Sequence, residues 1–138
     1  CGISGVFYFD QKKVKKDFLK KLNNKQKHRG PDASGIWISK DKKLGLAHTR
    51  LSILELSEKA NQPFKDESGD FVLTFNGEIY NYIKIREILK KKGYKFKTQN
   101  SDTEVLLYSY IEWGISCIQK FRGMFSFAIW DNKKKKYF

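Results

Sequence analysis

The chain opens with CGISGVFYF (residues 1–9), an apolar stretch that predicts a buried strand from Ile3 to Phe9. A strand at this place holds Cys1 rigidly, and Gly2 leaves space beside the thiol. An amino-terminal cysteine carries both a thiol (pKa about 8.5) and a free α-amine (about 8), so its amine can serve as the base for its thiol. A cysteine at position 1 can also be an accident of processing, so the candidate nucleophile depends on the residues that follow.

Hydrophobic spacing predicts strands and helices over the rest of the chain. Glycine and proline mark the loops, and the segment from Leu51 to Gly69 is expected to be mostly loop. Ser101 and Glu104 have the spacing of a capping box at the start of a helix. The expected elements are a helix over 14–22, a strand pair at 36–39 and 44–48, a strand over 71–75 that Asn76-Gly77 ends, a helix that stops at Gly93, a helix from Ser101 to Trp113, a short helix over 117–121, a strand over 124–130, and a turn at Asp131-Asn132 leading into a return strand at Tyr137-Phe138.

Length and composition limit the class of protein. The 138 residues, 40% of them hydrophobic, suit one globular domain, and no apolar run approaches the roughly 20 residues that span a bilayer. The net charge of +13 comes mostly from dispersed lysines, with only four arginines, which argues against a specific nucleic-acid binder. Two cysteines allow at most one disulfide, which favours a reducing compartment. We therefore expect a cytoplasmic protein without membrane association, whose charge serves solubility.

Several motifs accompany Cys1 along the chain. They are His28-Arg29-Gly30-Pro31-Asp32, Ala47-His48-Thr49-Arg50-Leu51-Ser52, Asn76-Gly77-Glu78-Ile79-Tyr80-Asn81, Ser101-Asp102-Thr103-Glu104 and the RGMFSFAIWD segment at 122–131. Each is weak or moderate by itself. In this order and spacing, they make the chain resemble the class II glutamine amidotransferases, and within them the asparagine synthetases, from Cys1 to Phe138.

The resemblance implies a pocket for glutamine. Arg50 would grip the substrate α-carboxylate through its planar guanidinium, and Asp102 would take the α-ammonium with help from Glu78. Leu51 and Ile53 are implied as further pocket residues. Each of these residues also has an ordinary alternative role. Arg50 could be a surface arginine that pairs with a neighbouring acid, Asp102 could only favour the helix dipole, and Glu78 could be an exposed acid.

The resemblance also implies an oxyanion hole, made by the Asn76 side-chain amide and the Gly77 backbone N–H, aimed at the oxygen that becomes negative during attack. The alternative is a hairpin turn, for which Asn-Gly is the strongest short signal. Beside Cys1 and the other motifs, we favour the oxyanion hole.

The remaining candidates are assigned structural roles. His28, Arg29 and Asp32 are expected to brace the loop around the pocket. His48 is a tempting general base, but the amine of Cys1 already fills that role, so we expect a packed, hydrogen-bonded histidine. Cys117 has a core spacing and is expected to be an inert buried thiol. The cysteines and histidines lack the spacing of a zinc site, so no metal is expected.

The fold implied by the resemblance is α+β, of the N-terminal nucleophile hydrolase type, with two antiparallel sheets stacked between helical layers. The implied activity is hydrolysis of L-glutamine to glutamate and ammonia through a Cys1 γ-glutamyl thioester, with ammonia supplied to a C-terminal synthetase domain. This domain would need no cofactor, whereas ATP and Mg²⁺ are expected only in the synthetase domain.

Residues 1–138 are expected to form a glutaminase domain that stops inside its own fold, with the synthetase domain absent from this sequence. A homodimer and the identity of the ammonia acceptor are left open. Three rival interpretations remain: a different N-terminal cysteine hydrolase, a basic nucleic-acid-binding module, and an inactive relative.

Overall fold

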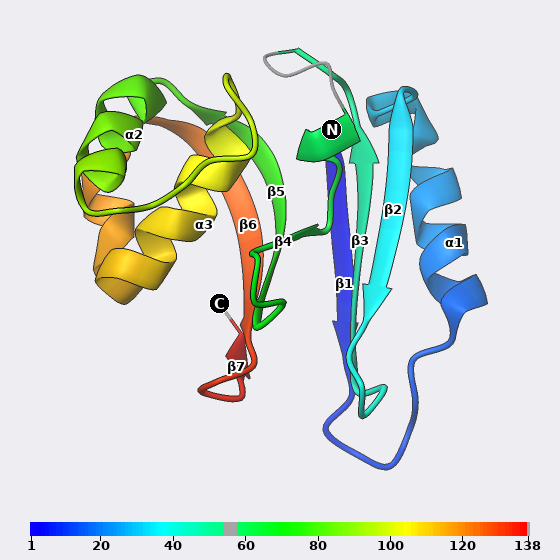
Figure 1. Cartoon of the computed structure of the whole chain (residues 1–138). Coiled ribbons are helices and arrows are strands. Elements are labelled where there is room, and N and C mark those ends of the chain that lie inside the picture. The colour runs from blue at the N-terminus through cyan, green and yellow to red at the C-terminus, as the bar shows by residue number, and fades with distance from the viewer. Residues whose placement is uncertain (54–57, 138) are drawn as a thin grey trace.

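Two antiparallel sheets stack face to face in the computed structural model, which describes residues 1–53 and 58–137 (Figure 1). The first sheet has the order β1-β3-β2, formed by Gly2–Phe7, Leu44–Arg50 and Ala33–Ile38. The second has the order β4-β5-β6-β7, formed by Phe64–Lys65, Phe71–Ile79, Gly123–Asp131 and Lys136–Tyr137.

Helices cover the two outer faces of this pair of sheets (Figure 1). Helix α1 (Lys16–Lys25) packs on the first sheet, while α2 (Tyr82–Lys91) and α3 (Asp102–Trp113) cover the second. Short 3₁₀ segments occupy Lys27–Arg29, Glu58–Ala60 and Gly114–Lys120. The expected arrangement of two stacked antiparallel sheets between helical layers is confirmed.

Three apolar clusters hold these layers together. Val14, Leu19 and Ala47 form the cluster between α1 and the first sheet. Leu44, Leu46 and Val72 pack between the sheets. The largest cluster joins the second sheet to α2 and α3 and includes Leu73, Phe75, Ile79, Leu89, Val105, Leu106, Leu107 and Ile129. Burial of apolar area on both faces of each sheet is therefore the main stabilising contribution to the fold.

Strand register brings the amino terminus to the site. Strand β1 pairs with β3 from Gly2↔Thr49 to Phe7↔Leu44, so one further step places Cys1 opposite Arg50. Alternation along β3 sends Leu44, Leu46, His48 and Arg50 toward the second sheet. The first apolar stretch thus forms the strand that the sequence predicts and fixes Cys1 between the two sheets.

The predicted end of a strand at Asn76-Gly77 is wrong. Strand β5 continues to Ile79 because its pairing with β6 runs without a break from Phe71↔Asp131 to Ile79↔Gly123. Gly77 has φ +148°, and a Cβ at this position would collide with the Met124 carbonyl oxygen. Glycine at position 77 therefore allows the two strands to approach closely, and it adopts a φ that other residues avoid. No turn forms here.

The predicted capping box is also wrong, although the helix begins and ends where expected. Ser101 is the N-cap residue of α3, but its side chain makes no capping hydrogen bond. The Glu104 carboxylate is fully buried and instead accepts hydrogen bonds from the Thr98 N–H (2.9 Å), the Thr98 hydroxyl (2.6 Å) and the Lys97 N–H (2.8 Å). Glu104 therefore stabilises the loop before α3 rather than its first turn.

Other expected elements agree with the structure within a few residues. Gly93 has φ +99° just after α2, as expected of a glycine that ends a helix. Part of the loop predicted between Leu51 and Gly69, residues 54–57, lies outside the described residues, as does Phe138 of the predicted return strand. Across the part of the chain that is described, no helix combines the length and apolar character needed to cross a membrane.

Candidate active site

Cys1 is fixed at both of its backbone ends by Arg29, which ends the 3₁₀ segment Lys27–Arg29. The α-ammonium of Cys1 donates to the Arg29 carbonyl oxygen at 2.8 Å, and the Arg29 Nε donates to the Cys1 carbonyl oxygen at 3.0 Å. A Cβ on Gly2 would meet the side chains of Gln26 and Thr49, so these side chains pack closely against the residue directly after Cys1. These contacts leave Cys1 little freedom of movement.

The thiol of Cys1 contacts the first residue after β3. The Leu51 N–H donates to the Cys1 Sγ at 3.3 Å, and the thiol in turn lies 3.5 Å from the Leu51 carbonyl oxygen. The backbone of Leu51 therefore contacts the thiol through both its N–H and its carbonyl oxygen, which fixes the position of the sulfur at the end of β3. The neighbouring segment is held by Asp32, whose carboxylate accepts from the Ser52 N–H at 2.8 Å. Arg29 and Asp32 thus brace this part of the site, as expected, whereas His28, the third residue expected to do so, is exposed.

The α-amine of Cys1 is tuned toward its neutral form. Burial lowers its pKa from the ordinary value of 8.0, and the positive charge of Arg29 lowers it further, while Asp32 acts in the opposite direction. A lowered amine pKa increases the fraction of neutral amine at pH 7. The amine beside the thiol is therefore suited to accept a proton.

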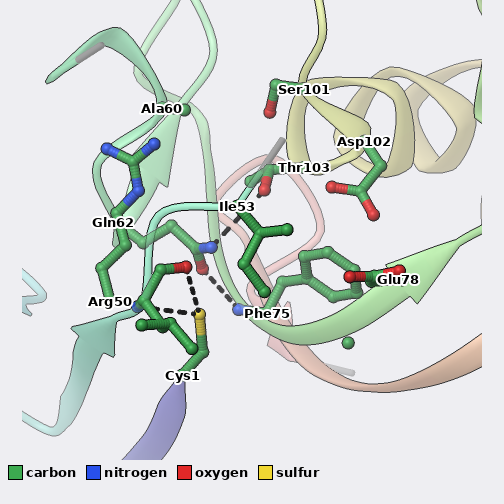
Figure 2. A pocket seen from close by; sticks show the side chains of 12 residues that line it. Cys1, Arg50, Ile53, Ala60, Gln62, Phe75, Glu78, Ser101, Asp102 and Thr103 are labelled. Carbon is green, nitrogen blue, oxygen red and sulfur yellow. Dashed lines mark hydrogen bonds between the residues drawn. The ribbon is translucent and has the colours of Figure 1, made fainter. Parts of the chain in front are cut away.

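A cavity of about 70 Å³ opens beside Cys1 (Figure 2). Of the residues named from the sequence, it brings together Cys1, Arg50, Leu51, Ile53, Gly77, Glu78 and Asp102. Asn76 does not line this cavity. Asn76 lines an adjoining groove of about 420 Å³, which shares Cys1, Ile53, Gly77 and Glu78 with the cavity.

Opposite charges occupy opposite sides of the cavity. Figure 2 shows the Arg50 guanidinium on one side and the carboxylates of Asp102 and Glu78 on the other, with Cys1 below them in this view. Arg50 is 7% exposed, and its Nη1 donates to the Asn61 Oδ1 at 2.7 Å, which holds the guanidinium against the cavity wall. A ligand carrying a carboxylate at one end and an ammonium at the other matches this charge distribution.

Asp102 lies at the first turn of α3 and reaches back to β5. Its Oδ2 accepts a hydrogen bond from the Ile79 N–H at 3.0 Å. Burial raises the pKa of Asp102 to about 6, the backbone hydrogen bonds oppose this rise, and the nearby Glu78 charge adds to it. A cation bound between these carboxylates would relieve the burial of charge.

Asn76 and Gly77 lie on β5, close to Cys1. Asn76 is half-buried, and its side chain makes no hydrogen bond to another residue in the described ranges 1–53 and 58–137. Odd-numbered residues of β5 direct their N–H groups away from β6, because the Phe75 N–H donates to Gln62 and the Ile79 N–H to Asp102. The same alternation directs the Gly77 N–H to this edge, toward the cavity that Gly77 lines.

His48 lies between the sheets and contacts the backbone of β5 rather than the thiol. Its ring is 1% exposed, and its Nε2 lies 3.0 Å from the Phe75 carbonyl oxygen. Burial lowers its pKa to about 4, so the ring is neutral at pH 7 and Nε2 carries the donated proton. This geometry agrees with the expectation of a packed, hydrogen-bonded histidine.

Several lining residues were not anticipated from the sequence: Ala60, Gln62, Phe75, Ser101 and Thr103. Ser101 and Thr103 lie on either side of Asp102 in the sequence, so their position beside a predicted pocket residue could have indicated that they line the cavity. Gln62 had no such signal, because it lies in an irregular segment before Pro63. Its side chain nevertheless connects the backbone of β5 to α3, through the Phe75 N–H at 2.6 Å and the Thr103 hydroxyl at 3.5 Å.

The second cysteine lies away from this site. Cys117 is fully buried in the cluster beneath α3, and burial raises the pKa of its thiol to about 11. The burial that its spacing predicts is confirmed, and the raised pKa disfavours the reactive thiolate. Within residues 1–53 and 58–137, no three His, Cys, Asp or Glu side chains gather as a set able to hold a metal ion.

Comparison with known proteins identifies the family. The chain matches the glutamine amidotransferase domain over residues 1–138. It is 38% identical to putative asparagine synthetase (glutamine-hydrolyzing) 2 of Methanocaldococcus jannaschii over 97% of this chain, and 42% identical to asparagine synthetase (glutamine-hydrolyzing) 1 of Bacillus subtilis over 95%. The chain spans only 28% and 21% of these two relatives.

A solved structure shares the fold. Glutamine phosphoribosylpyrophosphate amidotransferase from B. subtilis superposes with a TM-score of 0.76 at 21% identity, covering 96% of this chain and 35% of that one. This similarity confirms the expected N-terminal nucleophile hydrolase fold. Because the family match extends over every residue from 1 to 138, the chain belongs to the glutamine amidotransferase domain family.

Proposed function

We propose that this domain hydrolyses the side-chain amide of L-glutamine to glutamate and ammonia, with Cys1 as the nucleophile. The observation that carries the proposal is the position of Cys1 on a cavity that has Arg50 on one side and Asp102 with Glu78 on the other (Figure 2). The guanidinium would bind the α-carboxylate of glutamine, and the two carboxylates would bind its α-ammonium. Leu51 and Ile53 would pack against the aliphatic part of the substrate.

The proposed reaction begins with transfer of the thiol proton to the Cys1 α-amine. The lowered pKa of that amine supports its role as the base. The thiolate sulfur then attacks the amide carbon, and the Asn76 amide and the Gly77 N–H stabilise the resulting oxyanion. The protonated amine returns its proton to the leaving nitrogen, which departs as ammonia and leaves a γ-glutamyl thioester. Water hydrolyses the thioester to glutamate and regenerates the thiol.

We further propose that the domain works within a longer asparagine synthetase. The names of both curated relatives, and the small share of their length that this chain spans, support this assignment. Ammonia would pass to a C-terminal synthetase domain that uses ATP and Mg²⁺, with aspartate as the acceptor. The glutaminase domain itself would need no cofactor. Two free thiols are consistent with a cytoplasmic protein.

The test is a comparison of the full-length protein with its Cys1→Ala variant. The unmodified protein should release ammonia from glutamine and show a covalent mass increase of a γ-glutamyl group on Cys1, whereas the variant should do neither and still bind glutamine. Other primary amides and amide-bearing peptides should be poor substrates, because Arg50 and Asp102 select a free amino acid. Equal turnover of such amides would favour a different N-terminal cysteine hydrolase.

A further inference from the structure

The outer edge of β5 carries a row of three backbone N–H groups, those of Phe75, Gly77 and Ile79, and the two outer ones donate to side chains. Strand β4 pairs only with Leu73 and Val72, so it leaves the later part of this edge without a neighbouring strand. Along the uncovered edge, the Phe75 N–H donates to the Gln62 Oε1 at 2.6 Å, and the Ile79 N–H donates to the Asp102 Oδ2 at 3.0 Å. The Gly77 N–H lies between these two anchored groups.

Side chains therefore take the place of a neighbouring strand on both sides of Gly77. Phe75, two residues before it, is held at its N–H by Gln62 and at its carbonyl oxygen by His48, at 3.0 Å. Gly77 itself has φ +148° and no Cβ, so its own backbone is the most adaptable point of the strand. The direction of the Gly77 N–H then depends on how firmly the flanking residues are held.

Several contacts hold Gln62 in a fixed position. It is 8% exposed, and its Nε2 lies 3.5 Å from the Thr103 hydroxyl, next to Asp102. Its backbone carbonyl packs so closely against β2 that a Cβ on Gly35 would collide with it. The preceding residue, Asn61, accepts the hydrogen bond from Arg50 at 2.7 Å. One short segment thus contacts β5, α3 and Arg50.

We propose that Gln62 is a positioning residue, whose side-chain amide holds β5 so that the Gly77 N–H points at the developing oxyanion. This inference rests on the proposed function. Small displacements of an oxyanion donor lower the rate of the chemical step far more than they lower ground-state binding. Loss of the Gln62 amide should therefore lower the rate of the chemical step and leave the affinity for glutamine nearly unchanged.

The experiment uses Gln62→Met in the full-length protein, which keeps the side-chain length and removes the acceptor for the Phe75 N–H. We expect kcat for glutamine hydrolysis to fall roughly 10- to 100-fold. Glutamate γ-semialdehyde, which adds to the Cys1 thiol and places its oxygen where the oxyanion forms, should bind more weakly by a similar factor. Glutamine affinity, measured by calorimetry in the Cys1→Ala background, should change less than about twofold.

Thr74→Val is the matched control. It removes one buried hydrogen bond of the same strand, from the Thr74 hydroxyl to the Ala47 carbonyl oxygen at 3.3 Å, on the face away from α3. It should lower the melting temperature about as much as Gln62→Met does, yet leave kcat and semialdehyde binding unchanged. If Gln62→Met does not fold, Thr103→Val removes the distal partner of Gln62, and we expect a loss of about 2- to 5-fold in kcat and semialdehyde affinity together.

Two outcomes would overturn the role of Gln62. One is an unchanged kcat in the folded variant, and the other is an equal loss of glutamine and semialdehyde affinity, which would make Gln62 a simple binding residue. These results are distinct from failure of the proposed function. If the unmodified protein forms no thioester from glutamine, the glutaminase assignment is lost and the inference falls with it.

Discussion

Arg29 acts on Cys1 in two ways, because its carbonyl oxygen accepts from the Cys1 α-ammonium at 2.8 Å and its Nε donates to the Cys1 carbonyl at 3.0 Å. Its positive charge also lowers the pKa of that amine. A residue outside the cavity thus controls both the position and the protonation of the group that we propose as the base.

Replacement of Arg29 by Gln should therefore weaken catalysis through the amine. Without the positive charge, the pKa of the amine rises, so less of it is neutral at pH 7. We expect kcat/KM at pH 7 to fall roughly 10- to 100-fold and the acid limb of its pH profile to move to higher pH. Arg29→Lys keeps a charge but loses the fixed Nε contact, so its profile should shift less than that of Arg29→Gln. A uniform loss at every pH would assign Arg29 a purely structural role.

A blocked amine is the more direct test of the same base. A methionine retained before Cys1 would turn the α-amine into an amide without a basic lone pair, and the thiol would lose its positioned proton acceptor. We expect the blocked protein to fold but to lose about 10³-fold or more in glutaminase rate. Mass spectrometry should confirm the terminus of each form before the kinetic comparison. His48→Asn should do far less harm to the rate, and comparable rates for blocked and free termini would return a histidine to the role of base.

The two cysteines should differ sharply in reactivity. Burial raises the pKa of Cys117 to about 11, whereas Cys1 is half-buried beside the cavity. Iodoacetamide at pH 7.5 should modify Cys1 alone, and glutamine should slow this reaction by occupying the cavity. Peptide mapping after partial labelling measures both sites. Modification of Cys117 in the folded protein, or no protection by glutamine, would contradict this expectation.

The sequence predicted most of the fold because its apolar residues recur at strand or helix spacing. The first strand (Gly2–Phe7), the helix over Asp102–Trp113 and the long strand β6 all follow from such local patterns. Asn76-Gly77 failed as a signal for the end of a strand, because the same dipeptide can serve a tight approach of two strands. Only the pairing with β6, more than 40 residues later, distinguishes these two uses.

Part of the site was hidden from sequence reasoning for a similar reason. Arg50 and Asp102 were found because they lie in motifs, whereas Gln62 lies in a loop and acts through the distant residues Phe75 and Thr103. Glu104 was assigned to a capping box from its spacing, but its carboxylate is used by the preceding loop. Local spacing cannot decide between partners that only the tertiary fold brings together.

Gly77→Ala should cost both stability and activity. Alanine disfavours φ +148°, and its Cβ would meet the Met124 carbonyl oxygen and the backbone of Phe125. We expect the free energy of unfolding to fall by roughly 2 to 4 kcal/mol and kcat to fall further than the stability loss explains, because the N–H at this position would move. Thermal unfolding and steady-state kinetics on the same sample separate the two effects. Gly69→Ala is a suitable control, since Gly69 also has a positive φ (+73°) but has open space around its Cβ position.

The last prediction concerns the pH dependence of substrate binding, which should follow Asp102. Its pKa is raised to about 6 by burial, with a further contribution from Glu78. The charged form, which attracts the α-ammonium of glutamine, therefore predominates above about pH 6 and is lost as the pH falls through that value. In the Cys1→Ala background, the Kd for glutamine should be nearly flat from pH 7 to 8 and then rise, by up to about tenfold for each pH unit below the pKa.

Two variants separate Asp102 from its neighbour in this measurement. Asp102→Asn keeps an acceptor for the Ile79 N–H but has no charge, so binding should be weaker at pH 8 and its dependence on pH between 5 and 8 should largely disappear. Glu78→Gln should instead move the midpoint to lower pH, because the Glu78 charge helps to keep the pKa of Asp102 high. Calorimetry across this pH range gives both curves. If the midpoint stayed near pH 6 in Asp102→Asn, another group would have to control binding, and Asp102 would lose its assignment as the partner of the ammonium.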